Sequence, residues 1–85
     1  MSNEIKEFFN KQGSIGLILA IGPDGARYNE IEPQVAVSHD TLSNRIDDAR
    51  EMGLIETEGV SKGSTSVINR LTAAGMVCYK GMTQD

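Results

Sequence analysis

Residues 38–53 constrain the fold more strongly than any other part of the chain. Ser38 is a favoured N-cap residue, and Gly53 stands where helices commonly end in a left-handed residue. Between these ends, apolar residues recur at four- and three-residue steps: Leu42, Ile46 and Ala49. This spacing predicts an amphipathic helix with one buried face.

A β-hairpin and a closing helix are predicted directly after this helix. Residues 54–58 alternate enough in polarity to form a strand, and residues 66–71 are typical of its return strand. The connection between them is polar and contains two glycines, which suits a turn. Thr72 is then expected to be the N-cap of a helix over residues 73–80.

Two short helices are predicted at the start of the chain. Residues 3–11 place three apolar side chains at helical spacing, namely Ile5, Phe8 and Phe9. Residues 15–21 are apolar on nearly every side, which indicates a core helix that is too short to cross a membrane. We expect Ser14 to be the N-cap of this second helix, with Leu19 among its packing residues.

A short strand and a third helix are predicted in the middle of the chain. The turn residues 22–25 (GPDG) end the second helix, and residues 26–28 are expected to be extended. Asn29 and Glu32 approximate a capping box, which predicts a helix from residue 30 to about residue 35.

This order of elements predicts an α+β fold in one domain, because 85 residues are too few for two. Two helices joined by a tight turn and followed by a hairpin form a winged helix-turn-helix. The predicted parts are the N-terminal helices (3–21), a short strand (26–28), the helix-turn-helix (29–53), the wing hairpin (54–71) and a closing helix (72–80).

Five segments in order carry a family resemblance: residues 18–19 (IL), 27–31 (RYNEI), 41–46 (TLSNRI), 53–55 (GLI) and 71–75 (LTAAG). Together they resemble the HxlR-type winged-helix regulators, and the last two also resemble MarR-type and PadR-type winged helices. The chain departs from the HxlR pattern in lacking a tryptophan near residue 15. It also has Ala49 in place of a core leucine and Asn69 in place of an aromatic residue. The resemblance implies a dimeric, sequence-specific transcription regulator.

The predicted helix after Ser38 carries side chains suited to reading base edges. Asn44 suits adenine, Arg45 suits guanine, and Asp40 can accept a hydrogen bond from cytosine. Cations and hydroxyls elsewhere suit phosphate. The candidate contacts to double-stranded DNA are His39, Asp40, Thr41, Ser43, Asn44, Arg45, Arg27, Lys62, Ser64 and Arg70.

The charge balance is acidic, with 12 acidic against 8 basic residues and a net charge of −4. On composition alone this argues against a nucleic-acid partner, although it would suit a protein from a high-salt cytoplasm. A net negative charge does not exclude DNA, because the position of the charges decides, and Arg27, Arg45, Lys62 and Arg70 can share the side of the fold that would face DNA. The alternative is a winged-helix interaction module that binds a basic protein through the acidic helix face at Asp47, Asp48 and Glu51.

The terminal segments carry more apolar residues than so small a monomer needs, which favours a homodimer. The candidate interface consists of Ile5, Phe8, Phe9, Met76, Tyr79 and Met82. Cys78 lies among packing residues and is expected to pack rather than to sense redox state.

No cofactor, metal site or membrane contact is expected, since the chain has one cysteine, one histidine and no apolar run of membrane-spanning length. The sequence shows no nucleophile–base pair and no phosphate-binding glycine loop, which argues against an enzyme. We expect the protein to be cytoplasmic.

Overall fold

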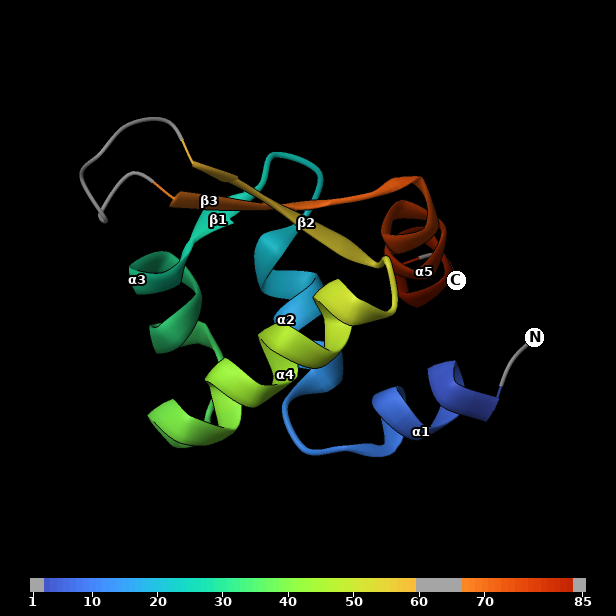
Figure 1. Ribbon diagram of the computed structural model, residues 1–85, viewed down its shortest axis with the longest axis horizontal. Helices are drawn as coiled ribbons and strands as arrows, with labels where there is room; N and C mark the ends of the chain where they lie inside the picture. The colour runs from blue at the N-terminus through green and yellow to red at the C-terminus, as the bar shows by residue number, and fades with distance from the viewer. Residues whose placement is uncertain (1–2, 60–66, 84–85) are drawn as a thin grey trace.

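The computed structural model describes residues 3–59 and 67–83, and its elements follow one another in the predicted order (Figure 1). They are α1 (Asn3–Asn10), α2 (Ser14–Ile21), β1 (Ala26–Arg27), α3 (Tyr28–Ile31), the 3-10 helix η1 (Glu32–Gln34), α4 (His39–Glu51), β2 (Ile55–Gly59), β3 (Val67–Leu71) and α5 (Ala73–Thr83). The sheet lies along one side, with α2 and α4 beneath it. Helices α1 and α5 lie at one end of the molecule and α3 at the other.

Helix α4 begins and ends as the sequence predicts. The Ser38 hydroxyl accepts a hydrogen bond from the backbone N–H of Thr41 at 3.2 Å, and Gly53 adopts a φ of 76° beyond the last turn. The predicted stripe is buried: the exposed fractions of Leu42, Ile46 and Ala49 are 0%, 6% and 0%.

The sheet is antiparallel with the strand order β1-β3-β2. In the hairpin, Ile55 pairs with Leu71 and Gly59 pairs with Val67, while Ala26 of β1 pairs with Asn69 on the other side of β3. Strands β2 and β3 of the hairpin each begin one residue later than predicted. The short strand β1 pairs with β3 and so connects the hairpin to the helical part of the chain.

Helix α5 packs closely against the start of the hairpin. Thr72 caps it as predicted, since its hydroxyl accepts a hydrogen bond from the Gly75 N–H at 3.1 Å. The Thr72 N–H donates to the Leu54 carbonyl at 3.0 Å, and a Cβ added at Gly75 would lie 2.0 Å from that same oxygen. Only glycine fits at this crossing.

Two predicted caps are wrong. Gly13, with a φ of 89°, precedes the first turn of α2 and accepts the Leu17 N–H through its carbonyl, so Ser14 lies inside the helix. Helix α3 begins at Tyr28, where the Glu30 carboxylate accepts the Arg27 N–H at 2.8 Å. The contact that caps α3 therefore joins Arg27 and Glu30, two residues earlier than the predicted pair of Asn29 and Glu32.

The core draws on helices and strands from both halves of the chain. Its buried apolar residues are Phe8, Leu17, Ile18, Ile21, Ala26, Ile31, Val35, Leu42, Ile46, Ala49, Leu54 and Ile55. Two expectations need correction. Leu19 is 43% exposed, because it lies on the side of α2 away from this core, and Phe8 is only 1% exposed within the monomer. Phe8 therefore contributes to the core of the monomer and leaves almost no surface for a dimer interface.

Replacing Ser38 by alanine is expected to lower the free energy of unfolding by about 1 kcal/mol, because the Thr41 N–H loses its acceptor. Ser43→Ala in the middle of α4 is the matched control and should change it by less than about 0.5 kcal/mol. Urea unfolding followed by circular dichroism measures both. Equal midpoints for the two variants would contradict the capping role.

Candidate nucleic-acid interface

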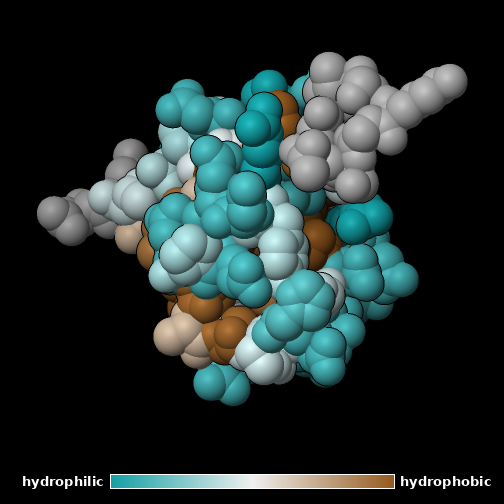
Figure 2. Space-filling model, turned by 90° about the vertical axis from the view of Figure 1, so that its left-hand side faces the viewer, coloured by the Kyte–Doolittle hydropathy of each residue, from teal (hydrophilic) through white to brown (hydrophobic). Residues whose placement is uncertain are grey.

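The side of α4 opposite the core is exposed and polar. The exposed residues along it are Asp40, Asn44, Asp47 and Glu51, as the helical spacing predicts. Figure 2 shows the side of the molecule where α3 and the start of α4 lie, and its surface there is mostly hydrophilic. This side of the helix therefore exposes hydrogen-bonding groups, and carboxylates are the most numerous charged groups on it.

The N-terminal turn of α4 is held by hydrogen bonds from Ser38 and from Tyr28 of α3. The Thr41 hydroxyl is half-buried and lies 3.0 Å from the Ser38 hydroxyl. His39 is exposed, and its Nδ1 lies 2.6 Å from the Tyr28 hydroxyl of α3. Tyr28 is not among the site residues that the sequence predicts. The sequence around Tyr28 gives no indication that its hydroxyl lies beside His39.

Arg45 is engaged inside the protein. Its guanidinium pairs with Asp48 one turn later, and its side chain is only 16% exposed. Asp48 also pairs with Lys11 at 3.3 Å, so Arg45 lies on the flank of α4 that faces the α1–α2 connection. Arg45 lies on a flank of α4, as the helical spacing predicts. Its ion pair with Asp48 leaves fewer of its N–H groups available to bond a guanine.

A hollow of about 210 Å³ lies on the other flank, between α4 and the sheet. Its charged members are Asp47 and Arg50, which pair with each other at 3.3 Å. Its remaining walls are Tyr28, Ser43, Ile46, Thr57, Val67 and Asn69. Arg50 was not among the predicted contacts. Its position three residues after Asp47 on the same helix is a spacing that could have indicated this ion pair.

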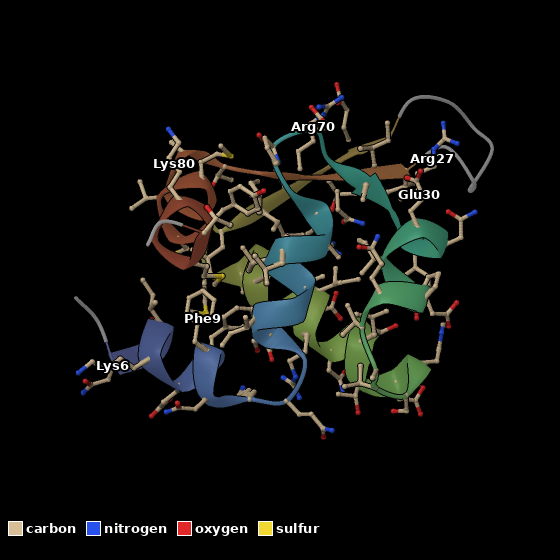
Figure 3. All side chains as sticks on the ribbon, turned by 180° about the vertical axis from the view of Figure 1, so that it is seen from behind. Lys6, Phe9, Arg27, Glu30, Arg70 and Lys80 are labelled. Atoms are coloured by element: carbon tan, nitrogen blue, oxygen red, sulfur yellow. The ribbon has the colours of Figure 1, made fainter. Side chains whose placement is uncertain are left out.

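The predicted cations do not share one side of the fold. Because Asn69 faces the α4 hollow, the next residue, Arg70, faces away from it. Its side chain pairs with Glu58 at 2.9 Å, and Figure 3 shows it on the side of the sheet away from the helices. Arg27 lies at the α3 end, close to Glu30 (Figure 3). Lys62 and Ser64 lie outside the described residues.

Charge near the start of α4 is therefore mixed rather than basic. Glu32 and Asp40 are exposed there, and Arg27 is the exposed cation on β1 beside α3. The amino end of a helix carries a partial positive charge that favours an anion. Near the start of α4, the groups that could attract phosphate are therefore few: the amino end of the helix and Arg27.

Cys78 packs against the core on α5, as predicted, and burial raises the pKa of its thiol. A raised thiol pKa lowers the share of the reactive thiolate at neutral pH. Residues 3–59 and 67–83 contain no cluster of three potential metal ligands. Within these ranges, every helix is too short or too polar to span a bilayer.

The arrangement of elements defines a winged helix-turn-helix of the α+β class, as predicted. A crystal structure from Porphyromonas gingivalis W83, described as a candidate transcriptional regulator of the MarR family, has the same fold. It matches with a TM-score of 0.76 and 18% sequence identity, over 98% of this chain and 90% of that chain. No protein-family model and no curated protein matches the sequence.

Proposed function

We propose that this protein is a sequence-specific, DNA-binding transcriptional regulator that reads the major groove with the N-terminal half of α4. The observation that carries this proposal is the capped N-terminus of α4, which presents exposed polar side chains on a winged helix-turn-helix scaffold. In this fold class the second helix of the motif enters the groove with its N-terminal residues at the base edges. The solved relative described as a regulator supports the same class of function.

Asn44 is the proposed principal base contact. It is exposed on the side of α4 opposite the core, and its amide can bond to adenine through both N6 and N7. Asp40 lies one turn earlier and suits cytosine, while Thr41 and Ser43 lie at the flanks. Arg27, Lys62 and Ser64 are the proposed phosphate contacts. Arg45 is proposed to orient α4 through Asp48 rather than to reach a base.

A homodimer is part of the proposal, since two copies would double a small set of contacts. Apolar side chains on the helices remain available for it: Val77 on α5 is 71% exposed, and Ile15 on α2 is 50% exposed. The half-buried residues proposed to contribute are Ile5, Phe9, Met76, Tyr79 and Met82. Such a regulator acts on DNA in the cytoplasm and catalyses no reaction.

The base-reading role is tested by selecting duplexes from a random pool and measuring their dissociation constants by fluorescence anisotropy. Asn44→Ala is expected to weaken the selected duplex by about 1–3 kcal/mol while leaving binding to mixed-sequence DNA unchanged. Uniform weakening on both kinds of DNA would show that Asn44 does not read sequence. Failure to enrich any duplex at low salt would contradict the DNA-binding function.

The phosphate-contact role of Arg27 is tested by the salt dependence of the same binding. Arg27→Ala is expected to reduce the slope of log K against log salt by about 0.9, because one phosphate contact is lost. Lys80→Ala is the matched control, since Lys80 is an exposed cation on α5, at the other end of the molecule (Figure 3). Equal slopes for Arg27→Ala and the unaltered protein would contradict the contact.

A second candidate function has one specific observation in its favour. A hollow of about 300 Å³ between α1 and the C-terminal half of α4 is lined by Glu4, Glu7, Phe8, Lys11, Asp48, Glu51 and Met52. Four carboxylates around Phe8 and Met52 suit a basic segment of another protein. Binding of a lysine-rich peptide that is lost in Glu7→Gln/Glu51→Gln, without any DNA binding, would favour this interaction module.

A further inference from the structure

Three side chains from three successive elements meet at the N-terminus of α4. The Tyr28 hydroxyl of α3 lies 2.6 Å from the Nδ1 atom of His39, and the two rings pack edge to face with centroids 5.3 Å apart. The Glu32 carboxylate of η1 lies 3.8 Å from the same Nδ1 atom. His39 is the first residue of α4 and the single histidine of the chain. The imidazole is thus held on one edge while 67% of the side chain stays exposed.

The two partners suit both protonation states of the ring. In the neutral ring, we expect Nδ1 to accept the Tyr28 O–H, which would leave the ring proton on Nε2. In the protonated ring, Nδ1–H donates to the Tyr28 oxygen or to the Glu32 carboxylate. The Nε2–H points away from these partners in either state, because they occupy the Nδ1 edge. Protonation therefore adds a positive charge without requiring the ring to turn.

The charge of this corner of the molecule depends on that proton. The groups that face the ring are the Tyr28 hydroxyl from α3 and the Glu32 carboxylate from η1, and Asp40 is its neighbour on α4. Two of these three are acidic, so a neutral His39 leaves the start of α4 with net negative side-chain charge. Histidine is the side chain that changes its charge between about pH 5 and pH 8.

We propose that His39 is a proton-controlled phosphate contact, positioned by Tyr28 and Glu32, through which DNA affinity rises as the pH falls. This inference rests on the proposed DNA-binding function and assigns its regulation to one named side chain. When protonated, the Nε2–H makes a charge-assisted hydrogen bond to a phosphate oxygen at the mouth of the groove. When neutral, the same N–H is a weaker donor beside two carboxylates.

The test is the affinity of a labelled duplex recovered by selection, measured between about pH 8 and pH 6. The unaltered protein is expected to bind about three to eight times more tightly per subunit at about pH 6, since one phosphate contact is gained at about 0.1 M salt. His39→Gln keeps a neutral donor and is expected to bind equally at both pH values.

Tyr28→Phe separates positioning from charge. Without the hydroxyl, the ring loses its orienting partner, so affinity is expected to fall at both pH values while the pH dependence remains. Circular dichroism of each variant establishes that the fold is kept. A pH dependence that survives His39→Gln, or constant affinity in the unaltered protein, would overturn the inference and leave the DNA-binding function intact.

Nuclear magnetic resonance of the free protein gives a readout that needs no DNA. Because the chain has one histidine, its imidazole nitrogens need no further assignment. The neutral ring should carry its proton on Nε2, and Tyr28→Phe should weaken that preference, because the Tyr28 O–H no longer donates to Nδ1. A neutral ring protonated on Nδ1 would contradict the arrangement itself. Absence of DNA binding at every pH would remove the proposed function, and this regulation with it, even where the ring is held as described.

Discussion

Replacing Gly75 by alanine is expected to lower the free energy of unfolding by about 3 kcal/mol or more, which is the high end for added bulk in a packed site. The new Cβ would lie 2.0 Å from the Leu54 carbonyl oxygen, far inside contact distance. That carbonyl accepts the Thr72 N–H, and the Thr72 hydroxyl caps α5, so the backbone cannot move away without breaking the cap. Thermal and urea unfolding measure the loss.

Gly81→Ala is the control for Gly75→Ala, because both glycines lie in α5 and the added methyl group at position 81 meets nothing within 4 Å. Alanine there should raise stability by up to about 1 kcal/mol through its higher helix propensity. Opposite signs for the two substitutions are expected. Similar stabilities for both variants would mean that α5 does not cross the start of the hairpin as closely as described.

Replacing Leu42 by alanine is expected to lower the free energy of unfolding by about 2–5 kcal/mol. Leu42 is the first residue of the α4 stripe and is fully buried, so the substitution removes apolar contacts and leaves a cavity. A domain of 85 residues has about 4–13 kcal/mol of stability in total, so this one change removes a large share of it. Urea unfolding at neutral pH provides the measurement.

Leu19→Ala makes the same chemical change at a site that is 43% exposed, and it should lower stability by about 1 kcal/mol or less. The comparison also separates stability from function, since Leu42 supports the helix proposed to enter the groove and Leu19 lies on another helix. A Leu42→Ala variant as stable as Leu19→Ala would contradict the placement of α4 on the core.

The sequence predicts helix α4 in detail because its signals are local. A cap, a repeating apolar stripe and a terminal glycine all lie within residues 38–53, and each acts through neighbours in the chain. The hairpin and the Thr72 cap are predicted for the same reason. The prediction that Ser14 is the N-cap of α2 is wrong, because Gly13 beside it adopts the left-handed conformation and occupies the N-cap position.

The candidate interface is less predictable, because its members are defined by partners distant in sequence. Tyr28 meets His39 across the turn of the helix-turn-helix, and Arg70 pairs with Glu58 across the hairpin. Arg45 and Arg50 have their partners one helical turn away, at Asp48 and Asp47, a spacing at which opposite charges commonly pair. A count of cations therefore overstates how many are free to meet phosphate.

The position of β2 in the sheet bears on how copies of this chain behave at high concentration. With the order β1-β3-β2, one row of β2 backbone groups faces outward, and such an edge can recruit a strand from another molecule. Glu56 and Glu58 are exposed along this strand. Two such edges brought together would place carboxylates near carboxylates, and this repulsion protects the wing from edge-to-edge aggregation.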